Sequence, residues 1–260
     1  RVVLFAGDYH GINDEVLVRS HMLKGRRMSS PIAPGIPSEM VHNMTVLDYG
    51  QPESLGFIES EAQNLAAVIV EPVQARRPEL QPKEFLHALR ALTLKTGSAL
   101  IFDEVVTGFR IHPGGAQAWF DVRADLATYG KVIGGGMPIG VIAGTAAYMD
   151  AFDGGMWQYG DNSIPEAGVT FFAGTFVRHP LAMAAAQAVL SYLKKESPRL
   201  QQDLNERTTR FAGEVNSCFE KAGLSLRLTH FASMCYFSHA EEMKYFSLLF
   251  HVLRDRGVHI

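Results

Sequence analysis

Three polar groups follow short apolar runs in the sequence, and they are the residues best suited to chemistry. Glu71 ends the run Asn64–Glu71, and Asp103 follows the run Ala99–Phe102. Further along, Lys131 lies just before three consecutive glycines, Gly134–Gly136. Ligands of open α/β sheets bind at the carboxyl ends of the strands. A lysine amine in a desolvated site there can act as a nucleophile toward a carbonyl group.

A lysine, a carboxylate and an aromatic ring are what a pyridoxal-type cofactor needs. The lysine forms a Schiff base, the carboxylate keeps the pyridine nitrogen protonated, and other groups bind the phosphate. Each residue alone has a simpler explanation, because a strand-end Asp is commonly a cap and a Lys is commonly solvated. A P-loop is excluded because its lysine follows the glycines, whereas Lys131 precedes them.

The apolar runs predict the elements that position these groups. Asn64–Glu71 and Ala99–Phe102 have the composition of strands buried on both faces. Between them, apolar residues at helical spacing predict a helix from Pro82 to Gly97. The resulting strand–helix–strand unit is typical of an α/β fold with a mostly parallel sheet flanked by helices. Further strands are predicted at Val2–Ala6, Val141–Thr145 and Val169–Phe172.

The pattern changes after Pro180, where helices become longer. Apolar stripes predict one helix from Pro180 toward Lys195, a second that ends near Gly223, and a third around residues 245–253. The stretch Leu224–Phe237 is strand-like. We therefore expect residues 1–190 to form part of a large cofactor-binding domain and residues 191–260 to begin a small α+β C-terminal domain.

Composition excludes several classes of function. The chain has 260 residues, of which 47% are hydrophobic and 20% charged, so disorder is not expected. A net charge of −3 gives no basic excess for nucleic acid. Cys218 and Cys235 lack the spacing of a zinc site, and no metal is expected. Without a signal peptide or a membrane-length apolar run, we expect no membrane association and a cytoplasmic location.

Four motifs together resemble the class III pyridoxal-phosphate aminotransferases, including the glutamate-1-semialdehyde aminomutases. The motifs are Tyr9–Gly11 (YHG), Glu71–Gln74 (EPVQ), Asp103–Arg110 (DEVVTGFR) and Lys131–Pro138 (KVIGGGMP). The resemblance implies the type I pyridoxal-phosphate fold and a homodimer with its site at the subunit interface.

The same resemblance implies roles for individual residues. Lys131 would bind pyridoxal 5'-phosphate as a Schiff base, and Asp103 would pair with the pyridine nitrogen. Tyr9 and Val105 would cover opposite faces of the ring, while Thr175 would reach the phosphate of the neighbouring subunit. Weaker assignments complete the predicted site: cofactor contacts at His10, Glu71, Val106 and Gly174, and substrate contacts at Gln74, Arg76 and Arg178.

Longer motifs resemble a narrower group, the aminotransferase domains of hybrid polyketide synthase/nonribosomal peptide synthetases such as those that make microcystin or nodularin. These motifs are Gly7–Gly11, Asp14–Arg19, Glu71–Pro82, His112–Phe120 and Phe171–Leu181. This resemblance implies amino transfer from glutamate or glutamine to a β-keto acyl thioester on the phosphopantetheine arm of an acyl carrier protein. Two alternatives remain: a free-standing aminomutase or ω-aminotransferase acting on a small molecule, and a non-catalytic phosphate-binding or scaffold domain.

The resemblance also predicts that these 260 residues are an excerpt. In the family, a Ser/Gly-Thr phosphate loop precedes the strand that opens this chain, and the C-terminal domain continues beyond Ile260. The family often has Gln three positions after the Asp, where this chain has Val106.

Overall fold

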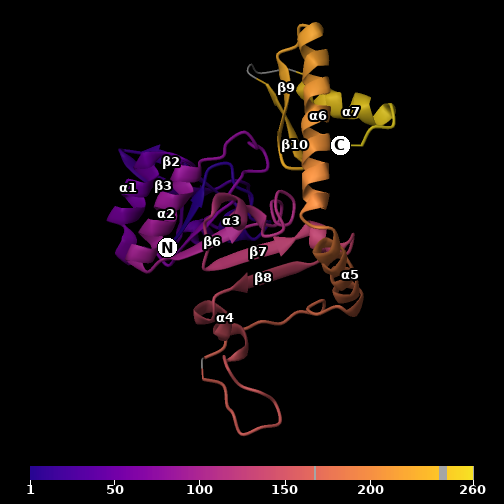
Figure 1. Ribbon diagram of the computed structural model, residues 1–260. Helices are drawn as coiled ribbons and strands as arrows, with labels where there is room; N and C mark the ends of the chain where they lie inside the picture. Colours follow the sequence, from indigo (N-terminus) through magenta and orange to yellow (C-terminus); the bar gives the residue numbers. More distant parts are fainter. Residues whose placement is uncertain (167, 240–244, 260) are drawn as a thin grey trace.

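The centre of the molecule is a six-stranded sheet in the order β4-β1-β5-β6-β7-β8 (Figure 1). The computed structural model describes all residues except 167, 240–244 and 260. The strands are β1 (Val2–Phe5), β4 (Met44–Leu47), β5 (Ala67–Val70), β6 (Ala99–Asp103), β7 (Leu126–Gly130) and β8 (Gly140–Gly144). All neighbours pair in parallel except β7 and β8, which are antiparallel. The carboxyl ends of β1, β5, β6 and β7 therefore lie at one edge of the sheet.

Helices and two small hairpins surround this sheet. The helices are α1 (Pro52–Ser60), α2 (Lys83–Thr96), α3 (Gly115–Phe120), α4 (Ala146–Asp153), α5 (Pro180–Glu196), α6 (Arg199–Lys221) and α7 (Phe246–Asp255). The hairpins are β2 (Val18–Leu23) with β3 (Arg26–Pro31), and β9 (Leu226–Phe231) with β10 (Met234–His239). Short 3₁₀ turns, among them η4 (Lys131–Gly134), link several elements.

The core lies between the sheet and α2. Phe85, Leu86 and Leu89 form the buried face of that helix, and they pack with Leu100 and Phe102 of β6 in one hydrophobic cluster. Each such fully buried side chain stabilises the fold by about 1.5–3 kcal/mol. This packing fixes the strand ends that carry the polar residues.

Most predicted elements are present. The predicted helix from Pro82 is α2, and Gly97, with φ +75°, ends it in the left-handed conformation that favours glycine. The predicted strand Asn64–Glu71 is shorter and begins at Ala67. The strand-like stretch Leu224–Phe237 is a hairpin, because the chain reverses at Ala232, whose φ is +53°.

The prediction of a strand at Val169–Phe172 is wrong. These residues lie in the long segment 154–179, which Figure 1 shows leaving the sheet between α4 and α5. An apolar run becomes a strand only where another strand pairs with it, and β8 pairs with β7 alone. Val169 and Phe171 are instead exposed.

The last part of the chain is built around α6 and joins the main core through Phe231 and Ala232 of its hairpin. The β9–β10 hairpin packs against this helix, and the Asn216 side chain bonds both the N–H and the carbonyl of Leu228. At the other end of α6, Gln201 donates to the carbonyl of Phe109 and Asn205 to that of Ile111. The predicted division after residue 190 falls inside α5 and stays a prediction. Within the described residues, none of the helices has the length and apolar character needed to cross a bilayer.

Candidate active site

A cavity of about 470 Å³ opens at the carboxyl ends of the central strands. Many of the site residues predicted from the sequence line this cavity: Tyr9, His10, Glu71, Asp103, Val105, Val106 and Lys131. They come from the segments that follow β1, β5, β6 and β7. The parallel sheet therefore brings together side chains that are far apart in the sequence.

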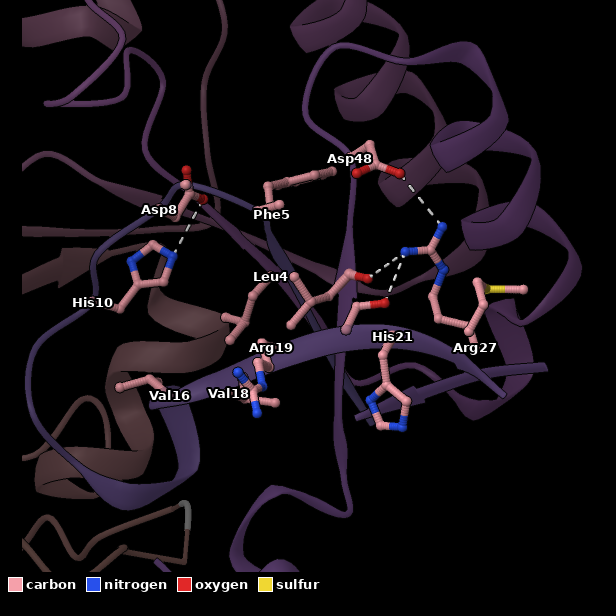
Figure 2. Close-up of a pocket in the computed structure, with 15 residues that line it drawn as sticks. Leu4, Phe5, Asp8, His10, Val16, Val18, Arg19, His21, Arg27 and Asp48 are labelled. Carbon is pink, nitrogen blue, oxygen red and sulfur yellow. Dashed lines mark hydrogen bonds and ion pairs between the residues drawn. The ribbon is translucent and has the colours of Figure 1, made fainter. Parts of the chain in front are cut away.

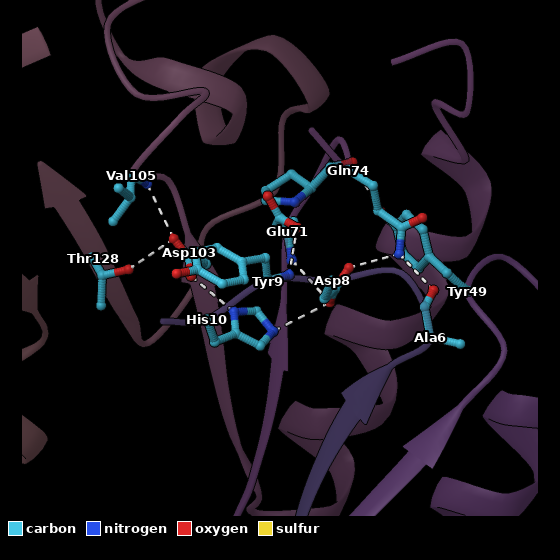
Figure 3. A network of polar contacts seen from close by, with 11 residues as sticks. Ala6, Asp8, Tyr9, His10, Tyr49, Glu71, Gln74, Asp103, Val105 and Thr128 are labelled. Atoms are coloured by element: carbon cyan, nitrogen blue, oxygen red, sulfur yellow. Dashed lines mark hydrogen bonds and ion pairs between the residues drawn. The ribbon is translucent and has the colours of Figure 1, made fainter. Parts of the chain in front are cut away.

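Asp103 is held by three donors at the end of β6 (Figure 3). Its Oδ1 accepts hydrogen bonds from the Val105 N–H (3.1 Å) and the Thr128 hydroxyl (3.2 Å). Its Oδ2 lies 2.8 Å from His10 Nδ1. Three donors to one carboxylate fix its orientation toward the cavity.

His10 lies between two carboxylates, with its side chain only 6% exposed. Its Nε2 lies 3.3 Å from Asp8 Oδ2, an ion pair rather than a well-aligned hydrogen bond. Burial by itself lowers the pKa of His10, but the two carboxylates outweigh it and raise that pKa to about 9. His10 therefore carries a positive charge at neutral pH.

Asp8 and Glu71 form the buried part of the same network. Gln74 donates to Asp8 Oδ1 (2.7 Å), and the Glu71 N–H donates to Asp8 Oδ2 (3.2 Å). Glu71 in turn accepts a hydrogen bond from the Tyr9 N–H (2.8 Å). Burial, helped by the nearby negative charges of Asp8 and Asp103, raises the pKa of Glu71 to about 7. The network thus fixes the backbone on which Tyr9 is carried.

Lys131 begins the 3₁₀ turn η4 directly after β7, and its backbone has φ +47°. This left-handed conformation is uncommon for a residue with a side chain and costs of order 1–3 kcal/mol. The glycines beside it allow close packing: a Cβ at Gly134 would lie 3.0 Å from Ile139, and one at Gly135 would lie 2.9 Å from Val189. Packing of η4 against Ile139 and α5 therefore holds Lys131 at the cavity.

Five predicted site residues lie elsewhere. Gly174, Thr175 and Arg178 are exposed on the segment 154–179, away from the cavity of their own chain. Arg76 is exposed on the loop after β5. Gln74 has no exposed surface and uses its amide on Asp8 and on the Ala6 carbonyl, so its partners are inside the protein rather than in the substrate.

Sequence reasoning assigned no role to three residues that the structure places in or beside the site. Asp8 holds His10, and Thr128 holds Asp103 because the register of β6 and β7 sets the two opposite each other. Glu104 is buried behind the cavity, where it accepts the N–H groups of Ala116 (2.6 Å) and Gln117 (3.1 Å) at the start of α3. The available sequence signal for two of them was adjacency to predicted site residues, in Asp8-Tyr9-His10 and in Asp103-Glu104.

The chain has the α/β fold of solved transaminases. Over its whole length it superposes on an omega-transaminase from Sphaerobacter thermophilus with a TM-score of 0.83 and 27% sequence identity, covering 61% of that chain. A structure described as a transaminase with PLP bound gives the same TM-score at 29% identity, covering 60% of that chain.

The sequence identifies the family within that fold. Residues 1–260 match the family Aminotransferase class-III, and the chain belongs to it. It is 34% identical over its whole length to glutamate-1-semialdehyde 2,1-aminomutase 2 of Lachnoclostridium phytofermentans. The chain spans 61% of the length of that curated relative.

Proposed function

We propose that the protein carrying this chain is a pyridoxal-phosphate-dependent aminotransferase that takes its amino group from glutamate or glutamine. The acceptor that we propose is a β-keto acyl thioester carried by an acyl carrier protein. The observation that carries the proposal is the placement of Lys131, Asp103, Tyr9 and Val105 around one cavity. Membership of the class III family supports the same reaction type.

The chain's own residues fit the ring of this cofactor. The cavity of about 470 Å³ has an amine at Lys131, a carboxylate fixed by donors at Asp103, and mostly apolar walls. Tyr9 and Val105 supply an aromatic and a branched side chain that would contact the ring faces. Donors for a phosphate are fewer in this cavity. We therefore assign the phosphate in part to Gly174 and Thr175 of a second copy of the chain.

Bound pyridoxal phosphate would supply a carbonyl group for amines and a pyridine ring that accepts electrons. Asp103, oriented by its donors, would hold a proton on the ring nitrogen and so stabilise negative charge that develops on the substrate. The amine of Lys131 would take the α-proton of the donor and return a proton in the second half of the reaction. The donor leaves as a 2-oxo acid, and the β-keto carbon of the acceptor becomes a β-amino carbon.

The acyl-carrier substrate rests on the narrower resemblance of the sequence motifs. Arg76 and Arg178 are exposed guanidinium groups, which pair well with a carboxylate or with the phosphate of a phosphopantetheine arm. Such an arm reaches an active site from a partner domain, so exposed cations near its path would suit that substrate.

A free-standing aminomutase or ω-aminotransferase is the second candidate function. The relatives reported above favour it, because they are described as an aminomutase and an omega-transaminase. The two candidates differ in the acceptor: a small molecule in one, a carrier-bound thioester in the other. Comparing turnover of a β-keto acyl chain free in solution with that of the same chain loaded on a carrier protein separates them.

We propose that the working unit is a homodimer. The segment 154–179 exposes large apolar side chains, with Tyr159 98% exposed, Phe171 92% and Phe176 81%. Apolar surface of this extent on an extended segment is typical of a protein–protein contact. A second copy that covered this segment would also bring Thr175 to a site.

Borohydride reduction tests the core of the proposal. The full-length protein is loaded with pyridoxal phosphate, reduced, digested and mapped. A pyridoxyl group on Lys131 is the expected result. A folded, cofactor-treated protein with no label on Lys131 would contradict the proposed function and would favour the non-catalytic scaffold.

A further inference from the structure

His10 separates two cavities. One is the cavity described above, and the second, of about 410 Å³, lies between β1 and the β2–β3 hairpin (Figure 2). Asp8 lines only the second cavity, whereas Asp103 lines only the first. The imidazole of His10 thus connects a carboxylate outside the candidate active site to the carboxylate inside it.

The charges around His10 are unevenly distributed. Asp8 follows β1, Glu71 follows β5, Asp103 ends β6 and Lys131 follows β7. On the side of the second cavity, the β2–β3 hairpin adds Arg19, His21 and Arg27. Two anionic oxygens lie within 3.3 Å of the ring nitrogens, and these two contacts are the only ion pairs that His10 makes with the described residues.

Asp8 is itself fixed by the fold. Its carboxylate is 1% exposed and accepts hydrogen bonds from the Gln74 amide and the Glu71 N–H. Burial raises the pKa of Asp8, and these donors, together with His10, oppose that rise by replacing part of the water that burial removes. Gly7, with φ +96°, leaves room for Gln74, because a Cβ there would lie 3.0 Å from its Oε1.

We propose that Asp8 is a positioning residue that holds His10 as an imidazolium between two carboxylates, so that a charged donor faces Asp103 and fixes the orientation of its carboxylate toward the cavity. With one carboxylate near each ring nitrogen, His10 donates a hydrogen bond to Asp103 and forms an ion pair with Asp8. Without Asp8, His10 keeps one carboxylate instead of two, so the imidazolium gives way to the neutral ring at lower pH and Asp103 then faces a neutral donor. The link to catalysis rests on the proposed function, whereas the protonation of His10 does not.

The direct test is a pH titration of His10 in the cofactor-free, full-length protein. NMR of ring-labelled histidine monitors the titration, and the signal missing from His10→Gln identifies the His10 resonance. In the wild-type protein we expect the imidazolium to persist to about pH 9. In Asp8→Asn, which keeps the shape and an acceptor for Gln74, the midpoint should fall by about 1–3 pH units. Asp48→Asn is the matched control, because Asp48 lines the same cavity but pairs with Arg27.

A kinetic readout separates positioning from simple structural support. Since His10 must be charged for full activity, the alkaline limb of the kcat profile should move in Asp8→Asn by the same amount as the NMR midpoint. The KM for the donor should stay unchanged, because Asp8 does not line the candidate active site. A uniform loss of activity with an unmoved pH profile would overturn the positioning role.

Two further outcomes would overturn the proposal: a His10 that is neutral at pH 7.5 in the wild-type protein, or an unmoved midpoint in a folded Asp8→Asn variant. If Asp8→Asn does not fold, Asp8→Ser gives the same comparison, because it also removes the charge and keeps an acceptor. The borohydride experiment tests the proposed function separately, since the His10 titration needs no cofactor.

Discussion

The two regions that carry the predicted site residues are built in opposite ways. At the strand ends, Asp8, His10 and Asp103 are connected by contacts of 2.8–3.3 Å and are largely buried. The described residues of the segment 154–179, which carries Gly174, Thr175 and Arg178, are mostly exposed. The first region is completed by folding of one chain, whereas the second presents its groups outward.

This difference separates two kinds of functional residue. A residue in the network is positioned by the fold and should act within its own subunit. A residue on the open segment has nothing to act on in its own subunit, so its role would need a second copy.

The largest effect is expected at Lys131. Lys131→Ala removes the amine and should lower kcat for amino transfer by roughly 10²–10⁴-fold, the contribution typical of a positioned acid–base group. The fold should persist, because the side chain is exposed and alanine meets the same backbone strain at φ +47°. Steady-state kinetics and thermal unfolding measure the two effects. Lys83→Ala on α2 is the control, and unchanged turnover in Lys131→Ala would refute the assignment.

The network should make stability depend on pH. The pKa of His10 is raised to about 9 from an ordinary value of 6.5, so the native state binds this proton more tightly than the unfolded state. The resulting stabilisation is fully present below pH 6.5 and is lost as the pH rises through 9. For the cofactor-free protein we expect a loss of about 3 kcal/mol across this range.

Thermal unfolding between pH 6 and pH 9.5 measures this loss. The raised pKa of Glu71, about 7, acts in the same direction at lower pH, because its protonated form is favoured in the native state. Asp8→Asn should flatten the curve above pH 7, while Asp48→Asn should leave it unchanged. Equal slopes for wild type and Asp8→Asn would show that the pair adds no pH-dependent stability.

Disturbing the packing behind the cavity should have a smaller but measurable effect on the free energy of unfolding. At Gly115 the backbone has φ +67°, and a Cβ would lie 2.3 Å from Glu104 Oε2. Gly115→Ala should therefore lower the free energy of unfolding by about 1–3 kcal/mol. Gly56→Ala in α1, where no atom lies within 4 Å, is the matched control. It should be neutral or stabilising by about 0.5–1 kcal/mol. Equal changes in the free energy of unfolding for Gly115→Ala and Gly56→Ala would show that the contact with Glu104 does not affect stability.

The sequence predicted those parts of the fold and site that depend on local patterns. Helical spacing gave α2, and the position of Lys131 and Asp103 after apolar runs placed both at the sheet edge. The support of Asp103 by Thr128 depends on strand register, which one sequence does not specify. The strand predicted at Val169–Phe172 failed for a related reason. Its apolar residues indicated burial but could not show that the partner was absent from the sheet.

The smallest effect is expected at Thr175, on the open segment. If its hydroxyl binds the cofactor phosphate, Thr175→Ala should raise the cofactor dissociation constant by about 10-fold, close to 1.4 kcal/mol. Stability of the cofactor-free protein should not change, because Thr175 is exposed. Thr170→Ala, also exposed on the same segment, should bind the cofactor normally. Fluorescence titration gives the cofactor dissociation constant of the wild-type protein and of both variants.

Mixed dimers decide whether Thr175 acts across the subunit boundary. In a dimer of one Lys131→Ala chain and one Thr175→Ala chain, a contact within each subunit leaves both sites defective. A contact between subunits instead pairs the intact Lys131 of one chain with the intact Thr175 of the other. One site then regains normal cofactor affinity and turnover, while the other lacks both groups. Recovery of about half the wild-type sites would place the open segment in the partner's site, and no recovery would confine it to its own subunit.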